Sequence, residues 1–329
     1  MKIINKLGLI CTTVLIAVGL LTACNAGEGS SSSDGDFTIG IIQMMEHPSL
    51  DLIRESFLEE MYALGYTNVD FDHRTGTGAD MTVLTTIAQT FVGNNVDLIL
   101  AIATPAAQAA AAATGDIPVV FAASTDPIAA GLVLNLAQPE GNVTGTSDMI
   151  CVESIFDFAL EFVPDAQTFG LVYNLGEVNS VSAINRAKEL LRARGLQYRE
   201  ATVTNTAEVQ QAALSLVGNV DAFFTPTDNT VASAMPIYVQ VATNAGIPIF
   251  TGADSMVMDG GFGTVGIDYS ILGAETARMV SRILAGVEIS NVPVVTMQDF
   301  RTIVNRETAE AIGICIEGLG ADIEIYPAR

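Results

Sequence analysis

The chain has no tryptophan, two histidines and few basic residues, and each shortage argues against a class of function. Its 329 residues contain 14 lysines and arginines against 37 aspartates and glutamates, for a formal net charge of −23. Nucleic acid is therefore excluded as a partner, because binding a phosphate backbone requires a basic face. His47 and His73, without any Cys-x-x-Cys pair, offer little for a structural metal site or for general acid–base catalysis.

Sequence motifs for catalysis and nucleotide binding are also missing. The chain has no nucleophile elbow, no Walker loop and no Rossmann fingerprint, and its short glycine clusters at 76–78 and 260–263 lack the required spacing and strand context. We therefore expect no enzyme, no catalytic residue, no cofactor and no metal.

The first 24 residues have the pattern of a bacterial lipoprotein signal. Lys2 and Lys6 give a basic start, an apolar stretch follows over residues 7–21, and Leu21-Thr22-Ala23-Cys24 closes it. The stretch has the length of a signal peptide rather than of a membrane span. The tetrapeptide resembles a lipobox, so residues 1–23 are predicted to be a signal peptide and Cys24 the lipidated first residue of the mature chain. This implies a protein anchored by lipid to the extracytoplasmic face of the cell membrane.

Residues 24–36 are predicted to be a tether, and the folded body to start near Phe37. The segment is rich in serine and glycine and has too few apolar residues to bury. Two further cysteines, Cys151 and Cys315, lie in the body of the chain. They could form a disulfide outside the cell, although isolated cysteines are more often small buried apolar residues.

From Phe37 onward, short apolar runs alternate with segments of helical period, which is typical of βα units around parallel sheets. In the first half, strands are expected at 37–44, 69–72, 97–103 and 118–121, with helices at 49–64, 80–92 and 106–113. In the second half, strands are expected at 168–173, 197–201, 222–225 and 248–250, with helices at 182–194, 207–217 and 231–245.

The two halves also repeat in their residues. Val96-Asp97 is followed seven residues after the aspartate by Thr104, then by Ile117-Pro118, an apolar strand and Asp126. Val220-Asp221 is followed at the same distance by Asp228, then by Ile247-Pro248, an apolar strand and Asp254. The economical interpretation is two copies of one α/β lobe.

Open parallel sheets bind ligands beyond the carboxyl ends of their strands, so polar residues just after the strands are the candidates for a site between two such lobes. In the first lobe these are Thr104, Pro105 and Ala106, then Ser124, Thr125 and Asp126, and, as a weaker candidate, His47. Thr104 is expected as the N-cap of a helix with Pro105 in its first turn, and such a helix start favours an anion such as a carboxylate.

The second lobe has its own polar clusters after the corresponding strands: Tyr173, Asn174, Glu177, Asn179, Ser180, Thr227, Asp228, Asn229 and Asp254. Carboxylates on this side could neutralise an ammonium group while the first lobe holds a carboxylate, and this pairing suits an amino acid. Each cluster also has a plainer interpretation as a helix start, a turn or a polar loop, and His47 as a helix cap at the surface.

The chain then offers three places where it could pass between the lobes: the region after 142–147, residues 266–269, and residues 292–299. Between the last two lies an amphipathic helix at 271–284 that would return to the first lobe, and 301–313 would complete the second. The predicted division is 37–145 plus 268–296 for the N-terminal lobe and 146–267 plus 297–329 for the C-terminal lobe.

Several of these motifs, taken together, resemble the ABC-transporter substrate-binding family described for tryptophan and tyrosine. They include Gln43 with Glu46 to Asp51, Ala103 to Gln108, Pro118 to Phe121 with Thr125-Asp126-Pro127, Asn142 to Gly145, Tyr173-Asn174 with Glu177 and Asn179-Ser180, Thr227 to Thr230, and Ile267-Asp268-Tyr269 with Gly273. The resemblance implies a type-I periplasmic-binding-protein fold, capture of a small molecule by hinge closure, and delivery to a permease driven by an ATPase.

The resemblance does not fix the ligand. Without tryptophan, the candidate aromatic contacts are Phe121, Tyr173, Phe250 and Tyr269, and sugar-binding relatives usually stack their ligand on tryptophan, which favours an amino acid here. The alternative function for the same interlobe site is sensing, in which the lipoprotein binds the ligand and presents it to a membrane receptor.

Overall fold

The computed structural model describes residues 37–77 and 80–327, arranged as two α/β lobes. The predicted signal peptide, Cys24 and the tether lie outside the described residues. None of the helices in the described part of the chain is long and apolar enough to cross a membrane.

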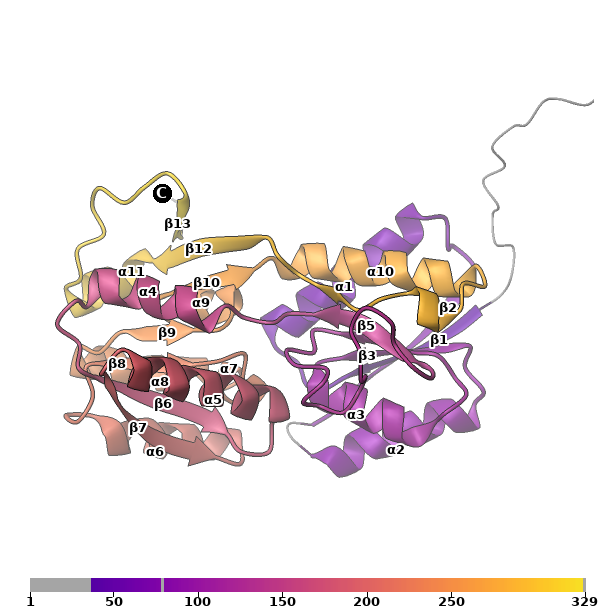
Figure 1. Ribbon diagram of the computed structural model, residues 1–329, viewed down its shortest axis with the longest axis horizontal. Helices are drawn as coiled ribbons and strands as arrows, with labels where there is room; N and C mark the ends of the chain where they lie inside the picture. Colours follow the sequence, from indigo (N-terminus) through magenta and orange to yellow (C-terminus); the bar gives the residue numbers. More distant parts are fainter. Residues whose placement is uncertain (1–36, 78–79, 328–329) are drawn as a thin grey trace, which may run out of the picture. The chain divides into compact units, whose positions relative to one another are not determined.

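The first lobe is built on a six-stranded sheet in the order β11-β5-β4-β3-β1-β2, and every neighbouring pair runs parallel (Figure 1). Its strands are β1 (Phe37–Gln43), β2 (Val69–Thr75), β3 (Leu98–Ile102), β4 (Val119–Ala122), β5 (Val143–Ser147) and β11 (Val295–Thr296). Its helices are α1 (Pro48–Ala63), α2 (Met81–Gly93), α3 (Thr104–Ala113) and α10 (Tyr269–Leu284), with a 3₁₀ turn, η2, at Ile289–Asn291.

The second lobe has a seven-stranded sheet in the order β13-β12-β10-β9-β8-β6-β7, parallel except for β12 against β10. Its strands are β6 (Thr168–Asn174), β7 (Gln197–Val203), β8 (Ala222–Thr225), β9 (Ile249–Thr251), β10 (Gly263–Ile267), β12 (Phe300–Asn305) and β13 (Ile323–Tyr326). Its helices are α4 (Val152–Phe162), α5 (Val178–Ala193), α6 (Val209–Leu216) after the 3₁₀ turn η1 (Thr206–Glu208), α7 (Asn229–Ala232), α8 (Met235–Ala245), α9 (Asp254–Met258) and α11 (Arg306–Ile312).

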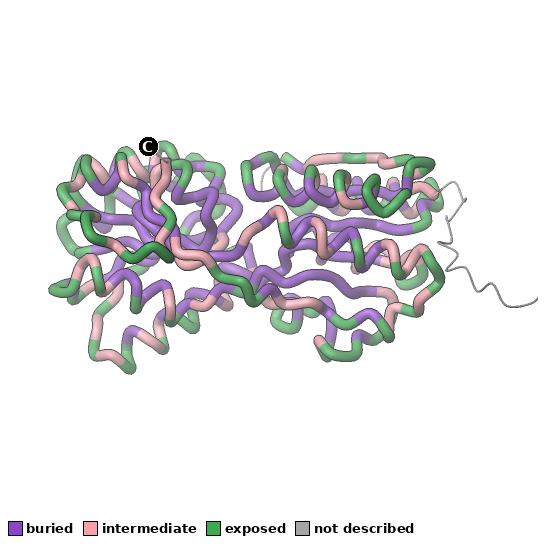
Figure 2. Tube along the Cα trace, turned by 90° about the horizontal axis from the view of Figure 1, so that it is seen from above, coloured by how far each residue is buried: buried purple, intermediate pink, exposed green. Residues whose placement is uncertain are grey.

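The central strands of both sheets are buried along their whole length, as the purple tube segments of Figure 2 show. In β3, β4 and β8 no residue alternates toward solvent, because helices cover both faces of a parallel sheet. This explains why these strands are unbroken apolar runs in the sequence. The prediction of two α/β lobes with parallel sheets is confirmed.

The chain passes between the sheets three times, after β5 at 148–151, after β10 at Asp268, and after β11 at 297–299. These connections are the predicted three-stranded hinge. The exact lobe limits drawn from the sequence stay a prediction.

Local details differ from the sequence-based expectations in the second lobe. The helix expected at 231–245 is two helices, α7 and α8, because α8 starts anew with Pro236 in its first turn. The helix expected at 207–217 opens with a 3₁₀ turn, and α4 and β13 were not predicted.

Cys151 and Cys315 are both free, so they do not form the disulfide that the sequence allowed. Cys151 is half-buried and Cys315 is exposed, so the alternative of a buried apolar residue does not hold for Cys315.

In the first lobe, α10 returns to pack against α1, and the contact depends on a glycine. A Cβ atom at Gly273 would lie 2.5 Å from the carbonyl oxygen of Ile53 and 3.0 Å from the Cβ of Ser56, both in α1. Backbone atoms cannot move aside as a flexible side chain can. The close approach of the two helices therefore requires a residue without a side chain at this position.

We predict that Gly273→Ala destabilises the fold by about 1–3 kcal/mol, because α10 must move away from α1. Gly93→Ala, at the end of α2 with no atom within 4 Å of the added Cβ, is the matched control and should be neutral or slightly stabilising. Urea unfolding of the three proteins measures the difference. Equal midpoints for Gly273→Ala and wild type would show that the helices are not in close contact.

Candidate functional site

A cavity lies beyond the carboxyl ends of the strands, where residues of both lobes meet. The first lobe contributes residues that follow β1, β3 and β4, the second lobe residues that follow β6, β8 and β9, and the hinge connections contribute two more. The lining residues are His47, Ser49, Leu50, Ala103, Ala123, Thr125, Asp148, Asn179, Thr227, Asp228, Asn229, Ala232, Ala253, Met256 and Tyr269.

Of the site residues expected from the sequence, six line this cavity: His47, Thr125, Asn179, Thr227, Asp228 and Asn229. Most of the others are buried around it without lining it: Gln43, Thr104, Pro105, Ala106, Ser124, Tyr173, Asn174, Glu177, Ser180 and Asp254. Asp126 lies at a separate small cavity of about 230 Å³, where it accepts a hydrogen bond from Ser182 at 2.6 Å. The structure thus divides the expected set into lining and supporting residues.

Glu177 is the main supporting residue of the second lobe. It is 1% exposed, and its carboxylate accepts four hydrogen bonds of 2.6–3.0 Å, two from the backbone N–H groups and two from the side chains of Asn229 and Thr230. These residues form the first turn of α7, whose N–H groups have no partner within the helix. Glu177 therefore fixes the position of α7 and the orientation of the Asn229 amide.

Asp228 is the N-cap of the same helix and is fully buried. One carboxylate oxygen accepts from Val231 N at 2.8 Å and the other from Asn174 N at 2.6 Å. Burial, together with the neighbouring negative charge of Glu177, raises the pKa of Asp228 to about 8. The carboxyl group therefore favours a cationic neighbour in the cavity.

His47 stands at the N-cap position of α1, but its side chain caps nothing. The imidazole is 8% exposed, its Nε2 lies 3.1 Å from Oδ1 of Asn229 across the two lobes, and its Nδ1 has no partner in the part of the chain that the structure describes. Burial lowers the pKa of His47, although Asn229 and the charge of Glu177 oppose this shift. The alternative of a capping histidine at the surface is wrong.

Asn179 offers a second buried polar atom without a protein partner. Its Nδ2 donates to the carbonyl oxygen of Thr227 at 2.8 Å, which fixes the amide, and its Oδ1 accepts from no described residue. Because buried polar atoms are normally hydrogen-bonded, these two atoms at one cavity are free to pair with a bound molecule.

Asp148 and Tyr269 line the cavity from the hinge, and the sequence analysis missed Asp148. Its carboxylate accepts from Thr125 Oγ1 at 2.9 Å and from the Tyr269 hydroxyl at 3.1 Å, and burial raises the pKa of both Asp148 and Tyr269. The available signal was its position directly after β5, at a lobe connection. Tyr269 was named among the aromatic candidates, and it is the one of the four that lines the cavity.

The other three aromatic candidates do not line the cavity. Phe121 and Phe250 are 0% and 1% exposed within the sheets, and the Tyr173 hydroxyl donates to Glu200 at 3.0 Å. All three lie in buried apolar strands, where they pack in the interior of the lobes.

The start of α3 differs from its expectation in one respect. Ala103, not Thr104, is the N-cap, with a left-handed φ of 79°, and the Thr104 hydroxyl lies 3.2 Å from that of Ser124 instead of capping the helix. Ala103 and Ala123, which also has positive φ, both line the cavity. Strained backbone of this kind persists where the surrounding structure holds it, commonly at binding sites.

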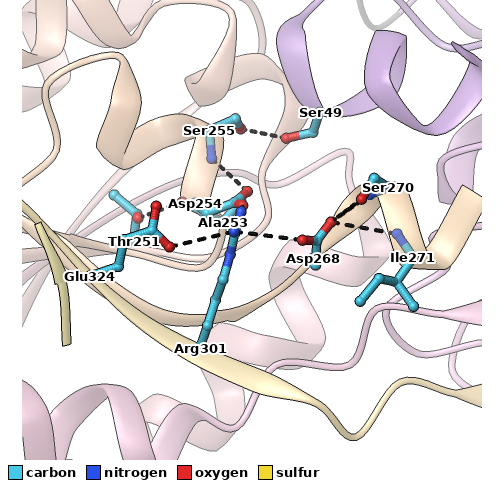
Figure 3. A network of polar contacts seen from close by, with 10 residues as sticks. All are labelled: Ser49, Thr251, Ala253, Asp254, Ser255, Asp268, Ser270, Ile271, Arg301 and Glu324. Carbon is cyan, nitrogen blue, oxygen red and sulfur yellow. Dashed lines mark hydrogen bonds and ion pairs between the residues drawn. The ribbon is translucent and has the colours of Figure 1, made fainter. Parts of the chain in front are cut away.

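A polar network at the hinge supports the α9 wall of the cavity (Figure 3). Arg301, in β12 after the third connection, pairs with the buried carboxylate of Asp254 and, at 3.5 Å, with Asp268 at the second connection. Asp254 accepts from Ser255 N at 2.7 Å, and the hydroxyl groups of Ser255 and Ser49 meet across the two lobes. Asp254 thus positions α9 rather than lining the cavity.

The two lobes are in contact at the cavity. Side chains meet across it in three pairs: His47 with Asn229, Ser49 with Ser255, and Thr125 with Thr227 at 3.0 Å between hydroxyl oxygens. The Ser233 hydroxyl also lies 2.8 Å from the Met45 sulfur. The lobes are therefore closed around the lined space.

Comparisons with known proteins agree with this geometry. The model of the family described as ABC transporter substrate binding protein matches residues 38–319. The chain is 36% identical over 319 residues to the tyrosine-binding protein of Clostridioides difficile strain R20291, covering 94% of this chain and 92% of the relative.

Two solved structures are also similar. One is the ABC domain in complex with L-Trp from Streptococcus pneumonia, with 35% identity, a TM-score of 0.83, and coverage of 86% of this chain and 97% of that one. The other is the ligand-free, open structure of a substrate-binding protein with adhesive properties from Clostridium difficile, with 38% identity, a TM-score of 0.68, and coverage of 89% and 100%. The chain is a member of the ABC transporter substrate-binding protein family and has the type-I periplasmic-binding-protein fold.

Proposed function

We propose that this protein is the extracytoplasmic, lipid-anchored receptor of an ABC importer and that it captures an aromatic amino acid between its lobes. The observation that carries the proposal is the interlobe cavity, in which buried acidic groups, and polar atoms without a partner among the described residues, lie beside an apolar wall. A concave site lined by apolar side chains and a few convergent polar groups is typical of small-molecule binding.

The acidic groups suit the ammonium of an amino acid. Asp148 and Asp228 line the cavity, both are at most 3% exposed, and burial raises the pKa of each. No lysine or arginine is among the lining residues. An ammonium group brought into this space would donate charge-assisted hydrogen bonds to these carboxylates and a further hydrogen bond to Asn179 Oδ1.

The start of α3 suits the carboxylate. The first N–H groups of a helix have no partner within it, and here they follow Ala103, which lines the cavity. Pro105 has no N–H, so Thr104 and Ala106 would supply the donors, and the positive end of the helix dipole favours an anion there.

The apolar part of the lining suits an aromatic side chain. Leu50, Met256 and Tyr269 provide contact surface, and four alanines, at 103, 123, 232 and 253, leave room between them. Methionine sulfur and tyrosine rings make favourable contacts with aromatic groups. The similar proteins named for tyrosine and solved with L-Trp support this ligand class.

The closed arrangement supports capture by hinge closure. This structure is more similar to the complex with L-Trp, at a TM-score of 0.83, than to the ligand-free, open structure, at 0.68, although the identity to the second is higher. Hydrogen bonds between the lobes would break on opening, and a ligand bound to both lobes would offset the cost of closing.

We predict that Asp148→Asn lowers the affinity for L-tyrosine or L-tryptophan by about tenfold to a hundredfold, because it removes the charge that receives the ammonium. The fold should be kept, since the hydroxyls of Thr125 and Tyr269 can rotate to accept from the new amide. Isothermal titration calorimetry measures the change. Asp116→Asn, at an exposed site, is the control and should bind like wild type. Unchanged affinity in Asp148→Asn would remove Asp148 from the ligand site, and no heat from any aromatic amino acid with wild type would refute the ligand class.

We predict that an aromatic amino acid releases protons when it binds near pH 7. A pKa of about 8 keeps Asp228 largely protonated in the free protein, and a nearby ammonium stabilises the carboxylate and lowers that pKa. Affinity should therefore rise as pH increases toward 8. The same raised pKa makes the stability of the free protein depend on pH. Protonated Asp228 gives its full contribution to the stability of the folded state below about pH 4, and this contribution is lost as pH rises toward 8. Calorimetry in phosphate and in Tris at pH 7 gives the number of protons exchanged, and identical heats in both buffers would contradict the prediction.

The anchor is predicted from the signal pattern that ends at Cys24, all of which lies outside the described residues. Cys24→Ser should move the protein from the membrane fraction to the soluble extracytoplasmic fraction, because a lipid chain can no longer be attached. Fractionation and immunoblotting of cells expressing each form measure this. Retention of Cys24→Ser at the membrane would contradict lipid anchoring and leave the ligand site unaffected.

A further inference from the structure

The tautomer of His47 is fixed by a chain of hydrogen bonds that starts at Glu177. The Glu177 carboxylate has no proton to donate when ionised, so the Asn229 atom 2.6 Å from it must be the NH₂ group. This places the Asn229 carbonyl oxygen toward His47, at 3.1 Å from Nε2. A carbonyl oxygen only accepts, so Nε2 of His47 carries a hydrogen.

The other ring nitrogen is then an acceptor. The charged groups nearest to His47 are Glu177, Asp51 and Asp259, and their attraction for a proton is outweighed by burial, which lowers the pKa of the ring. The neutral imidazole with hydrogen on Nε2 has a lone pair on Nδ1. His47 lines the cavity, and this Nδ1 is buried without a partner in the described part of the chain.

A buried acceptor of this kind selects for a ligand that carries a donor. Leaving it unpaired costs binding free energy, so a ligand without a donor at this point is disfavoured relative to one that has it. The polar lining has a second group around Asp148, linked through Thr125 to Thr227 and through Thr227 to Asn179. That group holds the carboxylate and amide oxygens suited to an ammonium, and the hydrogen bond of His47 within the described residues goes to Asn229 rather than to any of these four residues.

We propose that Nδ1 of His47 accepts a hydrogen bond from the ring donor of the bound aromatic amino acid, the phenol O–H of tyrosine or the indole N–H of tryptophan. This rests on the proposed function and deepens it: the site recognises an aromatic side chain that carries a hydrogen-bond donor, and it discriminates against phenylalanine. His47 is then a specificity-determining residue, and Glu177 and Asn229 are its positioning residues.

Calorimetry with the wild-type protein and three ligands tests the proposal without any substitution. L-Tyrosine should bind at least tenfold more tightly than L-phenylalanine and than O-methyl-L-tyrosine, which keeps the ring oxygen but has no hydrogen to donate. Equal affinities for the three would overturn the proposal while leaving capture of an aromatic amino acid intact. No binding of any of the three, nor of L-tryptophan, would instead refute the proposed function.

The variant His47→Ala assigns the discrimination to this side chain. We expect the ratio of tyrosine to phenylalanine affinity to fall to within about threefold of one, mainly through weaker binding of tyrosine. Glu59→Gln, at an exposed position of the same helix and outside the cavity lining, is the matched control and should keep the wild-type ratio. An equal loss of both affinities in His47→Ala would place His47 at the amino-acid end of the ligand and contradict the proposal.

Nitrogen-15 NMR of the wild-type protein measures the protonation of the His47 ring directly. The chain has only two histidines, so His73→Gln assigns both sets of ring signals. In the closed complex with L-tyrosine, His47 should be the Nε2–H tautomer with Nδ1 shifted in the direction of an accepted hydrogen bond, whereas the complex with L-phenylalanine should lack that shift. An Nδ1–H tautomer or a doubly protonated ring in the tyrosine complex would overturn the assignment.

Discussion

The buried carboxylate of Glu177 is the interaction on which the geometry of the site depends. It accepts four hydrogen bonds from the first two residues of α7, a helix of four residues that has little stability of its own. Through Asn229 it also fixes the ring of His47 on the opposite lobe. One carboxylate thus positions a helix start, an amide and an imidazole from both lobes.

The buried carboxyl groups around the cavity lower the stability of the fold but serve ligand binding. Glu177, Asp228 and Asp148 are each at most 3% exposed, and burying carboxyl groups is costly even when they are hydrogen-bonded. Two clusters of buried aliphatic and aromatic residues, built around the parallel strands, stabilise the fold and offset the cost of burying these polar groups. The supporting network continues at the hinge, where Arg301 offsets the buried charge of Asp254 and thereby holds α9. Within the second lobe these networks hold α7 and α9 in place, which lowers the ordering cost of binding.

The sequence predicted the fold better than the site. Strands such as β3 and β8 are unbroken apolar runs because both faces are covered, and their period and length identify them without tertiary information. The polar residues after them could be located for the same reason. The sequence could not predict which of these residues line the cavity, because that depends on contacts between distant residues. Asp228 lines the cavity, whereas Glu177 supports it by accepting hydrogen bonds from Asn229, 52 residues away. Asp148 was missed since its importance comes from Tyr269, 121 residues away, and Thr104 was misassigned because the strained backbone of Ala103 starts the helix one residue earlier.

The most direct test of this account is a crystal structure of the protein with L-tyrosine at a resolution that locates single atoms. We expect the amino acid in the cavity between closed lobes, its ammonium at Asp148 and Asp228, its carboxylate at the start of α3, and its phenol oxygen within about 3.2 Å of His47 Nδ1. A ligand whose carboxylate faces the two aspartates, or one bound outside this cavity, would contradict it.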